Sequence, residues 1–485
     1  MSPGARHQPT SRLARPIVLR AAARGLLAPA LSVLLLSAAC SETEPQATPR
    51  TVVPPALIAV LGPALGEPDD ADSGPAVPTG SRLVRLDKRA QDGRPQPLTA
   101  DFVAAGLARL TYDGEEILFV GRRAPSAPLG VFACDLEGKG LRSVVTQEHI
   151  GSPVTRLPDG RVVFSAALGS GAMPALFVAA GDGTPAQRIT FSGRAETDPC
   201  LLRDGRILYV GRLRGGRLGL GRGQAGLFTV FPDGSGTALF HAPPADTEVS
   251  RPTQAANGDV YFLANGELRR IGWRRPREPA QALSLPEGGS LLRATAAADR
   301  SLLLIHRAKD GTARAARLDA GGQSRDVSLP DLRGQHVRQL LEAVAAPRPQ
   351  GHLSRVDPTK TYGTWLGIDV KSGGAESATT LRVLAQDHSP FPTDAPFAIL
   401  GTTPLFEDGS FYVRVPTDMP LRLQLLDPDG KVVRRSTTPY WVRPNEVRGC
   451  TGCHDPDDHT PPNVSPLAAQ VEPVDLRWKS TEGNR

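Results

Sequence analysis

The N-terminal part of this sequence lacks acidic residues and also lacks an apolar run long enough to cross a membrane. Five arginines and no Asp or Glu precede the apolar stretch at residues 26–36. That stretch is well short of the ~20 apolar residues that a spanning helix needs. A basic start followed by a short apolar core is typical of a secretory signal peptide. We therefore expect residues 1–39 to be removed and the protein to be exported.

The chain after residue 39 also lacks a large net charge. The full sequence carries a formal net charge of +6, and five of its arginines lie within residues 1–39, so 6 − 5 leaves about +1. Binding to nucleic acid depends on a basic surface that neutralises phosphates. The mature chain therefore gives no support for a nucleic-acid partner.

Cysteine is scarce, with five in 485 residues, and the first of them ends the signal segment. The run "LLLSAAC" resembles a bacterial lipobox, in which Cys40 becomes the lipidated first residue of the mature protein. Ser37 stands where this pattern most often has Leu, and ordinary cleavage nearby is the alternative. Several acyl chains on one residue anchor a protein firmly, because each buried CH₂ contributes ~0.8 kcal/mol. Ser41 in place of Asp favours, by the same resemblance, the outer membrane, facing the periplasm or the cell surface.

Residues 40–80 are rich in proline and small residues, which predicts an extended tether without a fold. Beyond them a repeated layout begins, in which a two-residue turn precedes an apolar strand, as in "LTYDGEEILFVG" and "LLRDGRILYVG". The turns begin at Asp113, Asp159, Asp204, Asn257 and Asp299. Their intervals of 46, 45, 53 and 42 residues are typical of a β-propeller whose blades each hold several short strands.

The cadence of strand, "PDG" and strand resembles the TolB-type propellers. Residues 82–99 are similar to the last strands of a blade whose remaining strand would come from near residue 340. We expect six blades, with seven as the alternative, over residues 81–344. Each turn Asp is expected to act as a turn former, and no catalytic set is evident in this region.

Residues 345–444 contain alternating strands separated by Gly, Pro and Asp turns, with no helical stretch of any length. This pattern predicts a small antiparallel β-sandwich, and its hairpin resembles the seven-stranded carboxypeptidase-regulatory type. The whole chain is therefore predicted to be all-β, ending in a short irregular segment at residues 445–485.

That last segment contains "CTGCH", in which Cys450 and Cys453 are three apart and His454 follows at once. This is the spacing for c-type haem attachment, where two thiols bind the porphyrin vinyl groups and the histidine becomes an axial ligand of the iron. Export agrees with this, because the haem is attached outside the cytoplasm. A zinc site that also uses His459 and a plain disulfide are the alternatives.

The order of propeller, β-rich domain and "YWVRPNEVRGCTGCHDP" resembles proteins related to the hydrazine synthase alpha subunit. The family pattern is matched at residues 408–411, 415–420, 426–430 and 444–455, with departures at Asn445 and Asp455. The resemblance implies this architecture and one haem c. A second CxxCH is lacking, and no tyrosine follows His454 closely, so we do not expect hydrazine synthesis. Electron transfer with a redox partner protein is the expected role, and a propeller scaffold with a structural metal is the alternative.

The aromatic pair Tyr440 and Trp441 is expected to pack against the haem. The sixth iron ligand stays open, with His388, Met419, Tyr362 and Tyr440 as candidates and His459 placed unfavourably. The acidic run at residues 455–458 could steer a basic partner. Cys134 and Cys200 are expected to be buried free thiols.

Overall fold

The computed structural model describes residues 56–63, 77–86, 94–145, 150–169, 172–182, 184–212, 225–244, 246–276, 278–285, 290–297, 299–308, 311–332, 334–372, 374–386, 396–436, 439–451 and 465–477. Within these ranges the fold is all-β, as predicted, with one short 3₁₀ helix, η3 (Leu467–Gln470). No helix among the described residues is long and apolar enough to cross a membrane.

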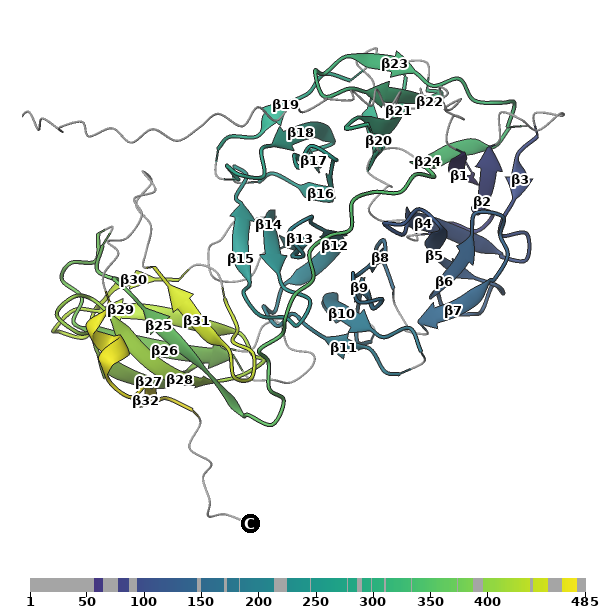
Figure 1. Cartoon of the computed structure of the whole chain (residues 1–485). Coiled ribbons are helices and arrows are strands. Elements are labelled where there is room, and N and C mark those ends of the chain that lie inside the picture. Colours follow the sequence, from purple (N-terminus) through teal and green to yellow (C-terminus); the bar gives the residue numbers. More distant parts are fainter. Residues whose placement is uncertain are drawn as a thin grey trace, which may run out of the picture. The chain divides into compact units, whose positions relative to one another are not determined.

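Six four-stranded antiparallel sheets form the blades of a propeller (Figure 1). Blade one contains β24 (His336–Glu342), β1 (Leu57–Gly62), β2 (Arg82–Leu86) and β3 (Gln96–Pro97). Blade two contains β4 (Ala104–Leu110), β5 (Glu116–Arg122), β6 (Gly130–Asp135) and β7 (Arg142–Val145). Blade three contains β8 (Thr155–Arg156), β9 (Val162–Ala166), β10 (Ala175–Ala179) and β11 (Gln187–Arg188).

The other three blades follow in chain order. Blade four contains β12 (Ala195–Leu201), β13 (Ile207–Arg212), β14 (Ala225–Val230) and β15 (Ala238–His241). Blade five contains β16 (Val249–Gln254), β17 (Val260–Ala264), β18 (Glu267–Ile271) and β19 (Gln281–Ala282). Blade six contains β20 (Ser290–Ala296), β21 (Leu302–Arg307), β22 (Ala313–Leu318) and β23 (Ser324–Asp326). The expected six blades are thus confirmed.

Blade one joins strands from the two ends of the propeller. β24 pairs with β1, which pairs in turn with β2, so the C-terminal strand completes the N-terminal sheet. The prediction that residues 40–80 form a tether without a fold is wrong for β1. Its sequence "LIAVLG" is almost wholly apolar, and both of its edges are hydrogen-bonded, so five of its six residues are buried. The predicted start of the propeller at residue 81 is therefore too late.

The Asp and Asn residues of the repeat turns form hydrogen bonds within those turns. In each of the five repeats the side chain of the turn Asp or Asn accepts a hydrogen bond from the backbone N–H two residues further on. This is the local bonding that favours Asp and Asn in such turns. It stabilises each of these strand-to-strand connections locally.

A strap at residues 343–350 leaves β24 and lies on three of these turns. Its bonds are Ala346 N to Tyr112 O at 2.6 Å, Arg348 Nη2 to Pro158 O at 2.6 Å and Gln350 N to Arg203 O at 2.9 Å. Gly205 has φ +85°, and a Cβ there would collide with the Gln350 carbonyl oxygen. The turn glycine therefore serves both the left-handed turn and the close approach of the strap.

The region after the strap is a sandwich of two four-stranded sheets that share one core. One sheet has the order β31 (Val447–Cys450), β25 (Tyr362–Gly367), β28 (Phe411–Pro416) and β32 (Val474–Asp475). The other has the order β27 (Phe397–Pro404), β26 (Thr380–Gln386), β29 (Leu421–Leu426) and β30 (Val432–Arg435). β31 and β32 pair in parallel with their neighbours. The segment predicted to be irregular thus supplies two strands of this sandwich.

Candidate functional site

Cys450, the first cysteine of the CxxCH motif, is the last residue of β31. Its backbone lies opposite Gly367 in the parallel pairing with β25, and its carbonyl accepts a hydrogen bond from Ile368 N at 2.8 Å. The side chain is half-buried and packs against the edge of the sandwich core. Cys453 and His454, together with His459 and Cys40, lie outside the described residues. The structure thus fixes the first thiol of the motif on a rigid strand.

An aromatic and cationic group lies next to Cys450, formed by Arg448 of β31, Trp365 of β25 and Tyr440. Arg448 is two residues before Cys450, so both side chains leave the same face of β31. The Arg448 guanidinium lies 4.9 Å from the centre of the Tyr440 ring and 5.9 Å from that of Trp365. Tyr440 and Trp365 meet edge to face at 6.3 Å. Tyr440 therefore contacts the side chain of β31 that lies on the same face as Cys450, and its packing against haem stays a prediction.

Trp441 lies elsewhere. Its side chain is 1% exposed and belongs to a core cluster of blades three and four, with Leu157, Tyr209 and Phe228. The indole Nε1 donates to the Gly234 carbonyl at 2.8 Å. Because protein already covers both faces of this ring, almost no area is left for a porphyrin. The structure gives Trp441 the role of an anchor between the sandwich segment and the propeller.

The residues between Trp441 and the motif continue this anchoring on the β14–β15 turn. The Glu446 carboxylate accepts from Gly236 N at 2.9 Å and from Arg443 N at 2.8 Å, and Arg448 Nη2 donates to the Thr237 carbonyl. Burial raises the pKa of Glu446, although the nearby Arg448 charge acts in the opposite direction. The strand that ends in Cys450 is thus held to the propeller by a partly buried ionic group.

A second contact on the same turn comes from the strap side. His352 Nε2 lies 2.9 Å from Asp233 Oδ2, and its ring stacks on Phe231 at 4.1 Å. Burial raises the pKa of Asp233, but hydrogen bonds from Ser235 and other groups outweigh this and lower it. The β14–β15 turn is therefore contacted both before and after the sandwich in chain order.

The candidates for the sixth iron ligand differ in how they are placed. Met419 is buried in the sandwich core. Tyr362 begins β25, five residues from the end that pairs with Cys450, or roughly 16 Å along a strand. His388 lies outside the described residues. Among the described candidates, Tyr440 is the one that contacts β31.

One feature near Cys450 fits a bound polar group. Trp365 is 2% exposed, and its Nε1 donor has no hydrogen-bond partner within the described part of the chain. A buried donor of this kind is costly unless an acceptor meets it. No cluster of three or more His, Cys, Asp or Glu side chains occurs within the ranges that the structure covers. The chemistry at this edge therefore depends on the thiol of Cys450 and on the residues that follow it.

Sequence reasoning found the motif but missed what positions it. The anchoring of Glu446 and Arg448 on the β14–β15 turn joins residues about 210 positions apart. The charged pair Glu446 and Arg448 directly before the motif was the available signal, but its partners were not readable from local pattern. Cys134 and Cys200 are buried and neither forms a disulfide, as expected.

Comparisons with known proteins support this architecture. Residues 373–455 match the family model described as hydrazine synthase alpha subunit middle domain. The solved structure of Kuenenia stuttgartiensis hydrazine synthase is similar at 17% identity and TM-score 0.72, covering 86% of this chain and 71% of that one. TolB from Acinetobacter baumannii matches at 14% identity and TM-score 0.38, covering 59% and 66%. Curated protein sequences gave no match. The chain is therefore similar to the hydrazine synthase alpha subunit middle domain over residues 373–455, and it shares its fold with the solved hydrazine synthase structure.

Proposed function

We propose that this protein binds one haem c through Cys450 and Cys453, with His454 as an axial iron ligand, and that it exchanges electrons with a partner protein. The observation that carries the proposal is that β31 ends at the first cysteine of the motif. This strand pairs along its length with β25 and so fixes the backbone that carries the first thiol. Bound haem c would supply one-electron redox chemistry at this edge of the sandwich.

The chain's own residues would hold and shield this group. Cys450 and Cys453 would form the thioether bonds, and His454 would give its imidazole nitrogen to the iron. Tyr440 offers an aromatic face beside β31, and the Arg448 guanidinium above it brings a positive charge to the same place. The unpartnered Trp365 Nε1 offers a buried donor to a polar group. These groups lower solvent access at the attachment site and fix its orientation.

The partner and the location follow from the rest of the sequence. The propeller provides the docking platform, and the acidic residues 455–458 favour a basic face on the redox partner. Lipid on Cys40 keeps the protein at the outer membrane, on the periplasmic side or the cell surface. Membrane attachment limits the search for a partner to one surface.

The test uses the full chain, expressed for export together with a haem-ligation system. We expect a reduced absorption band of c type that survives acid-acetone extraction. Cys453→Ser should sharply reduce the haem yield, whereas His454→Ala should change the spin state of the iron in the molecules that mature. Cys200→Ser is the matched control, because it removes a thiol outside the motif, and it should leave both spectra unchanged. Stoichiometric zinc and no Soret band in the wild type would refute the proposal.

A further inference from the structure

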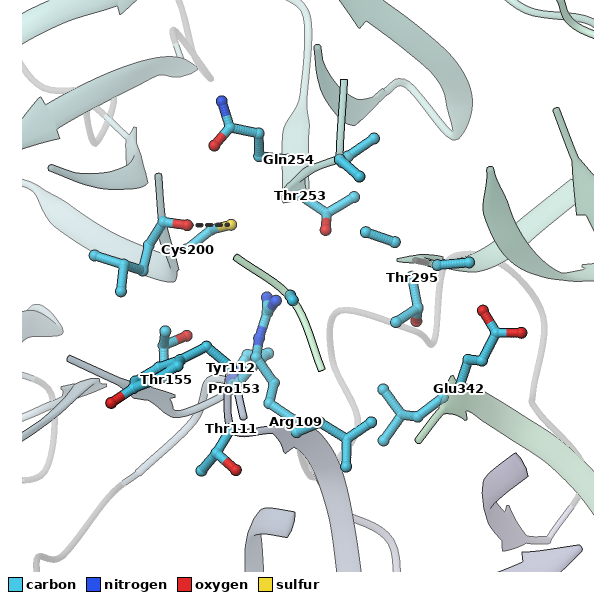
Figure 2. A pocket seen from close by; sticks show the side chains of 18 of the residues that line it. Arg109, Thr111, Tyr112, Pro153, Thr155, Cys200, Thr253, Gln254, Thr295 and Glu342 are labelled. Atoms are coloured by element: carbon cyan, nitrogen blue, oxygen red, sulfur yellow. Dashed lines mark hydrogen bonds between the residues drawn. The ribbon is translucent and has the colours of Figure 1, made fainter. Parts of the chain in front are cut away.

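A cavity of about 260 Å³ lies on the propeller axis, among the innermost strands of the blades. Figure 2 shows side chains from different blades around it, including Arg109 of blade two, Thr155 of blade three, Thr253 of blade five and Thr295 of blade six. The strap residues 344–347 form part of its wall. The cavity is thus enclosed by strands from around the ring and covered at one side by the strap.

The innermost strands share an irregularity at this depth. The pairing register shifts in β4, β12, β16 and β20, and on β24 Arg338 is the extra residue against β1. Leu107, Asp198 and Arg251 adopt left-handed φ angles of 51°, 53° and 53° at these bulges. Such angles are unfavourable for non-glycine residues and occur most often at functional sites. Bulges also redirect the side chains that follow them.

The bulges bring four arginines near the axis, Arg109, Arg251, Arg293 and Arg338. Arg109, Arg251 and Arg293 line the cavity, and Arg338 is close enough to interact electrostatically with Arg293. Two carboxylates also line the cavity: Glu342, which pairs with Arg317, and Asp198, whose Oδ2 accepts from the backbone N of Arg251 at 3.1 Å. The charged residues that line the cavity are five arginines (Arg109, Arg156, Arg203, Arg251 and Arg293) and two carboxylates (Asp198 and Glu342), so 5 − 2 gives a net charge of +3.

The four axial arginines have no acidic partner in the described part of the chain, unlike several other arginines of the propeller. Arg142 and Arg156 share Glu116, and Arg317 pairs with Glu342 at 2.6 Å. Among the described residues, by contrast, no carboxylate lies within ion-pairing distance of the four axial arginines. Arg338 donates to the Pro63 carbonyl at 3.1 Å and Arg251 to that of Leu292, while the Arg109 Nε is buried without a partner. The axis therefore holds guanidinium groups that have no ion-pair partner in the described part of the chain.

The charge is costly in this position. Burial lowers the pKa of Arg293 to about 9, the charge of Arg251 adds to this, and Asp198 acts in the opposite direction. Burial and the charge of Arg251 also lower the pKa of Arg338. The groups nevertheless stay protonated near neutral pH, so mutual repulsion persists unless an anion is bound. Guanidinium groups bind carboxylates and phosphates through paired hydrogen bonds.

We propose that the axial cavity binds a small molecule carrying two or more carboxylate or phosphate groups. The net charge requires more than one anionic group, and the small, strap-covered volume favours a molecule over a folded chain. Arg251 and Arg293 are the principal ligands, because both line the cavity and have no acidic partner in the described ranges. This site is separate from the CxxCH motif and does not depend on haem binding.

The test uses the full mature protein in detergent, titrated calorimetrically with citrate and with inorganic pyrophosphate at matched ionic strength. We expect one-to-one binding of at least one probe and a higher Tm than in chloride alone. Arg251→Gln and Arg293→Gln should each weaken binding at least tenfold. Arg293→Lys should cause a smaller loss, because lysine keeps the positive charge but lacks the paired donors of the guanidinium. Arg275→Gln removes an exposed charge outside the cavity and should change binding less than twofold.

Two further results guard against misfolding as the explanation. In chloride alone, Arg293→Gln should melt at or above the wild-type temperature, because one repelling charge is gone. All variants should keep the wild-type haem content. The proposal is overturned if neither probe binds, or if Arg251→Gln and Arg293→Gln bind as the wild type does. Binding of a polyglutamate peptide with no response to either small anion would also overturn it, in favour of an acidic peptide.

Discussion

Replacing Trp441 with alanine tests whether the segment before the CxxCH motif is anchored in the propeller. The ring is 1% exposed and packs among propeller residues of blades three and four. Phe191 meets it edge to face at 6.4 Å. The Nε1 hydrogen bond to the Gly234 carbonyl crosses between the two regions at 2.8 Å. The substitution therefore removes both a large buried ring and a hydrogen bond.

The expected cost follows from these two losses. Truncation of a buried aromatic to alanine destabilises by about 3–5 kcal/mol, because a cavity remains. The Gly234 carbonyl loses its donor, which costs about 1 kcal/mol more if water does not replace it. Trp441→Phe keeps most of the ring and removes the donor, so we expect about 1–2 kcal/mol from that variant.

The assay is urea unfolding followed by circular dichroism, comparing midpoints at unchanged slope. Trp273→Ala provides the matched control, since Trp273 is 40% exposed and its ring stacks with Arg274 at 5.2 Å. We expect under about 1 kcal/mol for this surface tryptophan. If Trp441→Ala lowers the midpoint of the first unfolding transition no more than Trp273→Ala does, the inference that Trp441 anchors this segment in the propeller is wrong.

Two other substitutions test neighbouring contacts. Because burial raises the pKa of Glu446, its contribution to stability is greatest below the unfolded pKa and declines as the pH rises through the folded pKa. As the pH rises from 4.5 to the raised pKa, the free energy of unfolding of Glu446→Gln, measured with urea, should therefore increase relative to that of the wild type. Parallel pH profiles of the two proteins would contradict this. Gly205→Ala should cost at least about 1 kcal/mol more than Gly266→Ala, because both have left-handed φ but only Gly205 approaches Gln350. Equal losses in Tm would show that the strap contact does not contribute.

The repeating part of the fold could be predicted because its signals are local. Five of the six blades contain a turn whose Asp or Asn side chain accepts a hydrogen bond from the backbone N–H two residues on, so the repeat period can be read in the sequence. β1 was missed because its partner strand β24 is about 280 residues away and its flanks are rich in proline. A short apolar run between prolines cannot be predicted to form a strand until its pairing partner is known.

The candidate site also has features that the local sequence predicts and others that it does not. CxxCH is a local spacing and could be recognised without structure. Trp441 was assigned to the haem because it is aromatic and close in sequence to the motif, yet the ring turns into the propeller core. The axial arginines gave no local signal, since they are brought together by bulges in different blades. Which way a side chain points from an irregular strand depends on pairing that the sequence pattern does not reveal.

The contacts on the β14–β15 turn bear on how an electron carrier could use a propeller. Arg448 donates to Thr237 in the propeller, and Cys450 follows two residues later on a paired strand. Few backbone torsions separate Cys450 from the Arg448 contact with blade four, so movement of Cys450 relative to that blade is restricted. A partner that docks on blade four would meet the proposed haem at a nearly constant separation. Electron transfer depends steeply on separation, so the anchoring of Glu446 and Arg448 on this turn would affect the rate even though neither residue takes part in the redox step.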